Sequence, residues 1–442
     1  MEIISVKYLL YVLLFLITFQ LLNTKYRSYW VLGFSLFFYG SISHILLLAL
    51  LISIGFNYWI TYTKFKFKNS IAIIFNTLLL FSFKWSPSNF ILPIGISFFT
   101  FQALSFVFDQ SNSKPVTIIQ FANYLSFFPQ LIAGPIETYD HLAPQLTLLK
   151  PIQRTHFFPG ISLALKGLVF KFVIANRCGI IVKSFYDEIS YFDGWMLLLA
   201  NTLFTFQILL DFSGYCLLAR GIAKIMGVEL SKNFFSPYLS SSLSDFWKRW
   251  HTTLHIWFKN YVFKPLIIKY SFWKVAGIIF LISSLWHGLK INFLIWGMTC
   301  FVLLLMDKYL IQKFIRSKKI TWFITFCCVS LSWIPFRISD FNALLNLSWN
   351  LNDFLLFVKD HHYVIFNDFM NNISSTCEYA GKNLGITFLD FYIMTLSLIT
   401  FCVCSIIFKS KIIHNLYTSF IFFLLLCFLG FDNSTPFIYF QF

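Results

Sequence analysis

The sequence predicts an all-α, polytopic membrane protein, and two observations support this prediction. The chain of 442 residues is 58% hydrophobic and only 12% charged, so a soluble fold would lack the polar surface needed to face water. The apolar residues gather in successive runs, several of them near the ~20 residues that a helix needs to cross a bilayer. We expect about 10 to 12 membrane segments in one domain spanning residues 1–442, with some helices broken or re-entrant.

The distribution of charge agrees with a membrane protein and argues against a nucleic acid partner. Lys and Arg total 34 against 18 Asp and Glu, and many of the cations sit in short loops between apolar runs. This pattern is typical of cytoplasmic loops and of contact with anionic lipids. The nine cysteines lie mostly inside apolar runs and indicate neither a disulfide framework nor a CxxC metal site.

The first part of the chain contains short and interrupted spans. Residues 8–22 form the expected first span, which has no small-residue cleavage site. The following spans are residues 29–62, broken near Gly40, then 71–83, 91–107 and 121–136. The segment 91–107 opens with Pro93 and Gly95, and the segment 121–136 contains Pro129, Gly134 and Pro135; both patterns predict broken helices. The loop with Lys25 and Arg27 and the loop at residues 64–68 should both be cytoplasmic, since two spans separate them, and this places the N-terminus outside.

Two further apolar helices are expected at residues 157–174 and 195–218. The second contains Asp211, an acid inside an apolar run. Such a group either holds the bundle together through an internal hydrogen bond or belongs to a functional site. The sequence leaves both interpretations open.

Residues 244–266 predict an amphipathic helix that begins with Ser244 as its N-cap. Helical spacing divides its side chains into an aromatic face with Trp247, His251, Leu254 and Phe258, and a basic face with Lys248, Thr252, His255 and Lys259. We expect the helix to lie at the cytoplasmic interface, with its basic side chains toward lipid headgroups.

The apolar run 275–306 is interrupted at His287, Gly288, Lys290 and Asn292. The part before His287 is too short to cross a bilayer alone, so the break falls within or near the membrane. Placing an ionisable group within the membrane costs free energy, so His287 is either a functional residue or a helix cap at the interface.

The last third of the chain alternates basic loops and spans. We expect a cytoplasmic loop at 307–319, an outward span at 321–334, and an outer polar loop at about 337–388. Spans at 389–408 and 412–429 then leave the tail, residues 431–442, on the outer face.

Six motifs occur in a fixed order along the chain. They are PIGISFFTFQALS (93–105), FFPQLIAGPI (127–136), LLDFSGY (209–215), SDFWKRWH (244–251), LWHG with His287, and WIPFR (333–337). Together they resemble the bacterial branch of the membrane-bound O-acyltransferase family. The resemblance implies a central acyl-transfer tunnel, with His287 and His251 as catalytic residues and Asp211, Arg249, Trp286 and Gln130 in support.

Two features resemble the members that O-acetylate polysaccharides more than those that transfer D-alanine to teichoic acids. These are NFFSPYLSSSLSDFW (233–247) and the aromatic tail PFIYFQF (436–442), which the D-alanylation systems carry on a separate peptide. The resemblance makes Tyr439 a candidate acyl acceptor, although it could also be an interfacial anchor. Lys259 and Asn260 replace the family's frequent Arg-Asp pair, and His255 stands where a serine is common.

The chemistry implied by the resemblance is transfer of an acetyl group from acetyl-CoA, with no bound cofactor. His287 would act as the general base, since its unperturbed pKa of ~6.5 suits proton removal from a hydroxyl. His251 would position the thioester. A metal site is not expected, because two distant histidines without clustered carboxylates are a poor ligand set.

The expected setting is the bacterial cytoplasmic membrane, with both termini outside. The expected partners are the lipid bilayer, acetyl-CoA, and a separate extracytoplasmic O-acetyltransferase that passes the group to a surface polysaccharide such as peptidoglycan or an alginate-like polymer. Three alternatives remain: D-alanyl transfer to teichoic acid, acylation of a lipid or protein, and transport. A transporter would typically show repeated broken segments, and the sequence shows no such repeat.

Overall fold

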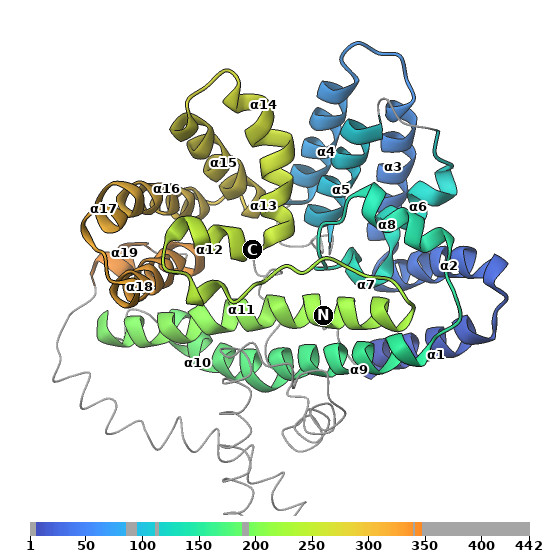
Figure 1. Ribbon diagram of the computed structural model, residues 1–442, viewed down its shortest axis with the longest axis horizontal. Helices are drawn as coiled ribbons and strands as arrows, with labels where there is room; N and C mark the ends of the chain where they lie inside the picture. The colour runs from blue at the N-terminus through green and yellow to red at the C-terminus, as the bar shows by residue number, and fades with distance from the viewer. Residues whose placement is uncertain (1–5, 85–94, 111–114, 188–193, 339–340, 347–442) are drawn as a thin grey trace, which may run out of the picture.

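The computed structural model describes residues 6–84, 95–110, 115–187, 194–338 and 341–346. These residues form helices joined by loops, without a β-strand in the described ranges (Figure 1). Five helical segments there are long and apolar enough to cross a membrane: His44–Thr61, Arg154–Gly179, Gly194–Ile225, Ile291–Phe314 and Lys318–Arg337. Three shorter apolar helices accompany them: Tyr8–Leu21, Ile96–Asp109 and Phe272–His287. The prediction of an all-α, multi-pass membrane protein is confirmed.

The N-terminal helices follow the predicted interruptions. They are α1 (Val6–Leu21), α2 (Thr24–Ile42), α3 (His44–Thr61), α4 (Lys68–Lys84) and α5 (Ile96–Asp109). The break expected near Gly40 lies at Ser43, whose extended backbone separates α2 from α3. Gly95 precedes α5 with a φ of 87°, and a Cβ there would lie 2.0 Å from the carbonyl oxygen of Leu131. A glycine is therefore required where α5 begins.

The proline-containing segment is broken, as predicted. It forms α6 (Ile118–Ser126) and α7 (Phe128–Leu131), followed by α8 (Tyr139–Thr147). Phe127 separates α6 from α7, two residues before Pro129.

Two long helical segments lie side by side along the lower edge of Figure 1. They are α9 (Arg154–Leu168), continued by the π-helical η2 (Val169–Ala175) and α10 (Asn176–Asp187), and α11 (Gly194–Ile225). A Cβ added to Gly167 would lie 2.5 Å from the carbonyl oxygen of Gly214, so these glycines allow α9 and α11 to approach closely.

The C-terminal half of the described chain differs from the sequence prediction in two places. Its elements are η4 (Pro237–Leu239), α12 (Leu243–Arg249), α13 (Thr252–Phe258), η5 (Lys259–Phe263), α14 (Lys264–Ile267), α15 (Phe272–His287), α16 (Ile291–Met306), η6 (Asp307–Ile311), α17 (Gln312–Phe314), α18 (Lys318–Arg337) and α19 (Phe341–Leu345). The prediction of a continuous amphipathic helix over residues 244–266 was wrong. The helix α12 starts after the N-cap Ser242 and ends before His251, where the backbone turns. The predicted basic loop at 307–319 was also wrong, because the chain stays helical to Phe314.

Two groups of helices, α2–α8 and α12–α18, rest on α9–α11 (Figure 1). One hydrophobic core joins the groups, and it includes Phe128, Phe212, Trp250, Trp286 and Trp333. The cavity described below lies within the second group. The outer polar loop beyond residue 346 and the tail at 431–442 lie outside the described residues.

Candidate active site

A cavity of about 400 Å³ opens among α12, α13, α15, α16 and α18. His251 and His287 both line it, so the structure brings together the two histidines that the sequence singled out. The other lining side chains are mainly aromatic or aliphatic. They include Trp247, Trp250, Leu254, Phe258, Phe263, Phe272, Ile279, Phe280, Trp296 and Trp333.

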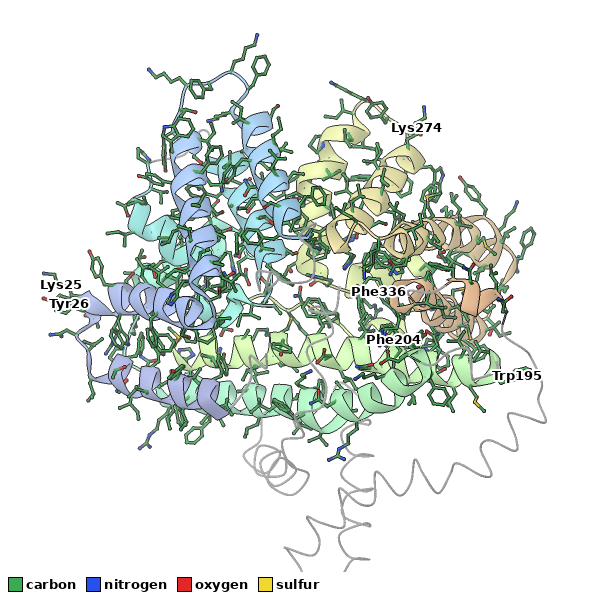
Figure 2. The ribbon with its side chains drawn as sticks, turned by 180° about the vertical axis from the view of Figure 1, so that it is seen from behind. Lys25, Tyr26, Trp195, Phe204, Lys274 and Phe336 are labelled. Carbon is green, nitrogen blue, oxygen red and sulfur yellow. The ribbon has the colours of Figure 1, made fainter. Side chains whose placement is uncertain are left out.

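His287 is the last residue of α15 and only 7% exposed. Its ring centroid lies 4.7 Å from that of Trp286 and 5.0 Å from those of Trp296 and Phe336. Phe336, labelled in Figure 2, belongs to α18, so three helices enclose the imidazole. The helix ends here as the sequence predicted. A Cβ at Gly288 would lie 2.5 Å from the ring of Phe293, so a side chain at this position would displace that ring.

His251 occupies the turn between α12 and α13 with a left-handed backbone, φ 43° and ψ 54°. This conformation costs roughly 1–2 kcal/mol for a residue with a Cβ. Asn233 holds the turn: its carbonyl oxygen accepts from the Thr252 amide at 2.9 Å, and its Oδ1 accepts from the Thr253 hydroxyl at 2.6 Å. Strained residues that the surrounding structure fixes in place are frequent at active sites.

The His251 ring is enclosed by aromatic side chains. Its centroid lies 4.8 Å from that of Phe212, 6.1 Å from that of Phe98 and 6.3 Å from that of Trp286. The side chain is buried, and in the described part of the chain neither ring nitrogen has a hydrogen-bond partner. Buried polar atoms are normally paired, so these nitrogens are available to a ligand that enters the cavity.

The remaining polar groups at the cavity are predominantly basic. Lys248 and Lys259 are exposed and His255 is half-buried, and all three line the same cavity as His251. The predicted division into an aromatic face and a basic face was therefore wrong, since the turn at His251 brings members of both sets to one cavity. Burial lowers the pKa of His255 below its ordinary value, and the charges of Lys259 and Lys248 lower it further.

The supporting residues proposed from the sequence occupy different places. Asp211 pairs with Lys171 of η2, with 2.7 Å between Oδ1 and Nζ, and both side chains are buried. Arg249 pairs with Asp245 at 2.9 Å. Gln130 is buried and donates from Nε2 to the carbonyl oxygen of Tyr124. These three side chains do not belong to the cavity lining in the described structure.

Trp286 lies next to the histidines. Its Nε1 donates to the carbonyl oxygen of Ser97 at 3.0 Å, and its ring stacks on Phe101 with 5.5 Å between centroids. It thereby connects the end of α15 to α5. Tyr439 lies outside the described residues.

Sequence analysis missed one polar residue beside His287. Lys84, the last residue of α4, donates from Nζ to the carbonyl oxygens of Trp286 and His287, the latter at 2.8 Å. The only signal in the sequence was a lysine directly after an apolar run, which is equally typical of an ordinary membrane border.

Comparison with known proteins agrees with this geometry. Residues 26–334 match MBOAT, the membrane-bound O-acyltransferase family. The chain is 29% identical over 390 residues to the peptidoglycan O-acetyltransferase of Helicobacter pylori, covering 74% of this chain and 73% of that protein. It is 30% identical over 307 residues to the probable alginate O-acetylase AlgI of Pseudomonas aeruginosa, covering 65% of this chain and 56% of that protein.

A further relative is the teichoic acid D-alanyltransferase of Bacillus subtilis, 26% identical over 245 residues, covering 49% of this chain and 60% of that protein. The family match covers more than two thirds of the chain and includes both histidines of the cavity. The protein is therefore a multi-pass membrane acyltransferase, and it belongs to the membrane-bound O-acyltransferase family.

Proposed function

We propose that this enzyme transfers an acetyl group from cytoplasmic acetyl-CoA to an extracytoplasmic acceptor, for the O-acetylation of a cell-surface polysaccharide. The observation that supports it most is that His251 and His287 line one largely apolar cavity with basic residues along it. A long, thin thioester donor with anionic phosphates matches this combination of surfaces.

The shape of the cavity suits such a donor. It is lined by Phe272, the first residue of α15, and by His287, the last, which are separated by roughly 22 Å along a helix of this length. Exposed Lys248 and Lys259 offer ammonium groups to phosphates. Apolar side chains such as Ile279 and Phe280 would enclose the uncharged arm of the donor.

The positions of the basic loops support a cytoplasmic entrance. The loops before α4 and before α15 lie at the same edge of the molecule in Figure 1, and Lys274 marks that edge in Figure 2. The first loop carries Lys64 and Lys66 and the second Lys269. Because cytoplasmic loops are enriched in Lys and Arg, we assign this edge to the cytoplasmic side of a bacterial inner membrane, with both termini outside.

The proposed reaction is an ordinary acyl transfer. The acceptor hydroxyl oxygen attacks the thioester carbonyl carbon while His287 removes the hydroxyl proton. The tetrahedral intermediate collapses, the carbon–sulfur bond breaks, and the thiolate of coenzyme A takes up the proton from His287. An ester and free coenzyme A result. His251, whose ring nitrogens have no hydrogen-bond partner among the described residues, would bind and orient the thioester.

Tyr439 is the proposed first acceptor. Its phenol, with an ordinary pKa of ~10, requires a base, and the resulting aryl ester is reactive enough to pass the acetyl group on. A separate extracytoplasmic transferase would then carry the group to peptidoglycan or an alginate-like polymer, the substrates named for the relatives above. Transfer of D-alanine, as named for the Bacillus relative, or acylation of a lipid or protein is the alternative.

The donor can be identified directly. The protein in lipid vesicles is incubated with labelled acetyl-CoA or with a D-alanyl thioester of a carrier protein, and release of free thiol is followed. The proposal predicts thiol release from acetyl-CoA by the wild type and by His255→Ser, and none by His287→Ala. If only the D-alanyl thioester is turned over, the proposal of acetyl transfer is wrong and D-alanyl transfer takes its place.

A further inference from the structure

A lysine from the N-terminal half of the chain binds the helix end that carries His287. Nζ of Lys84 donates to the carbonyl oxygen of His287 at 2.8 Å and also to that of Trp286. It lies 5.8 Å from the centroid of the Trp286 ring. Lys84 is not part of the cavity lining, so it contacts the backbone of the site and leaves the donor space free.

The contact has a clear physical basis. The last carbonyls of an α-helix have no partner within the helix, and the helix dipole places partial negative charge there. A lysine ammonium donates hydrogen bonds to these oxygens and places a positive charge beside them. Because α15 ends inside the protein at His287, water has limited access to these carbonyl groups, and leaving them unpaired would be unfavourable.

Lys84 is presented by a helix that is itself fixed. Asn76, two turns earlier on α4, donates from Nδ2 to Oδ1 of Asn57 on α3 at 2.7 Å, and both side chains are buried. The other side of the same helix end is held by α5, where Ser97 accepts from the Trp286 indole at 3.0 Å. The end of α15 is thus held between α4 and α5.

We propose that Lys84 is a positioning residue, whose contacts with the Trp286 and His287 carbonyls fix the His287 imidazole at the cavity. This inference rests on the proposed role of His287 as the base. Lys84 acts through the helix end and takes no proton from the acceptor. A positioning role affects the rate of transfer, whereas donor binding in the cavity is left intact.

The test compares Lys84→Met with Lys290→Met in the full-length protein in lipid. Lys290 lies three residues after His287, but its side chain is exposed and makes no cap hydrogen bond, so it is a matched control. We expect Lys84→Met to lower kcat for acetyl transfer about 100-fold, the effect of a catalytic group misplaced by ~1 Å. KM for acetyl-CoA should stay within about twofold, and Lys290→Met should match the wild type.

A second measurement does not depend on the reaction. Hydrogen–deuterium exchange of the peptide covering residues 284–293 should be faster in Lys84→Met than in the wild type and in Lys290→Met, because the helix end has lost its anchor. If the Met variant does not fold, Lys84→Gln, which loses the charge and shortens the side chain but keeps an amide donor, is used and should change kcat and exchange in the same direction by a smaller amount.

The outcomes separate this inference from the proposed function. Wild-type kcat in the Lys84 variant, or a lower melting temperature with unchanged kcat per folded molecule, would overturn the positioning role while acetyl transfer stands. If the wild type transfers no acetyl group, the proposed function fails instead. The exchange experiment then still tests the anchor, and unchanged exchange in the variant contradicts it.

Discussion

His251 and His287 line the same cavity, and each also packs against the ring of Trp286. They reach it from two helix breaks: His251 directly precedes α13, and His287 ends α15. A break frees backbone groups that a membrane-embedded site would have to satisfy, so such breaks are tolerated where they line a cavity. The arrangement places two imidazoles at one cavity whose other lining side chains are mostly apolar.

Substitution of His251 should separate its chemical role from its backbone role. His251→Ala is expected to lower the rate of acetyl transfer about 100-fold, the size of effect expected when the thioester is no longer held in its reactive position. It should also be less stable than His251→Gly, because only glycine adopts the left-handed turn without cost. Transfer rates and thermal unfolding of both variants check this prediction.

His255→Ser is the control, since His255 lines the same cavity from the next turn of α13. It should retain most of the activity. Wild-type rates in His251→Ala and His251→Gly would remove His251 from the site.

The ion pair between Lys171 and Asp211 should contribute to stability as a unit. Removing one partner takes the nearest opposite charge from a buried ionised group, so Lys171→Met or Asp211→Leu should each cost about 3–5 kcal/mol of unfolding free energy. The double variant should be more stable than either single variant, because neither charge remains. Unfolding of the four proteins in the same detergent measures this coupling. Additive losses in the double variant would show that the pair is not coupled.

The cavity lysines should affect donor binding more than the rate. Lys259→Met is expected to raise KM for acetyl-CoA about tenfold, equivalent to ~1.4 kcal/mol, because an ammonium group facing the donor phosphates is lost. The value of kcat at saturation should hardly change. Lys264→Met, an exposed lysine just beyond the cavity, provides the control. Equal KM values for the two variants would contradict binding of the phosphates at Lys259.

The hydrogen bond between His141 and Glu137 predicts a pH-dependent contribution to stability. Nδ1 of His141 lies 2.7 Å from Oε2 of Glu137, and this bond raises the pKa of His141 above its ordinary value of 6.5. The stabilisation is complete below the unfolded pKa of about 6.5 and disappears as the pH rises through the higher folded pKa. The melting-temperature difference between the wild type and His141→Gln should therefore be largest below pH ~6.5 and smaller at alkaline pH. A melting-temperature difference between the two proteins that increases with pH would contradict the prediction.

The sequence predicted the helix ends that have a strong local signal. Gly288 and Lys290 interrupt an apolar run, and the chain does leave its helix at His287. Pro129 likewise marked the break between α6 and α7. In both places glycine, proline or a charge changes the local preference, so the pattern alone was sufficient.

Other features depend on contacts between distant residues. The turn at His251 has neither glycine nor proline. It is held by Asn233, which lies outside residues 244–266, the range over which the sequence predicted a helix. Lys84 meets His287 across 203 residues, and Asp211 meets Lys171 on another helix. Periodicity describes one helix at a time, so it identified the polar residues but not their partners.

The most direct test of the account is the mass of the C-terminal peptide after incubation of the purified protein in lipid with labelled acetyl-CoA. The account predicts acetyl on Tyr439 in the wild type and in the control His255→Ser, and its absence in His287→Ala that is folded to the same extent. Acetyl on Tyr439 in His287→Ala, at the wild-type level, would contradict the role of His287. Turnover of acetyl-CoA without any label on Tyr439 would contradict the role of the tail.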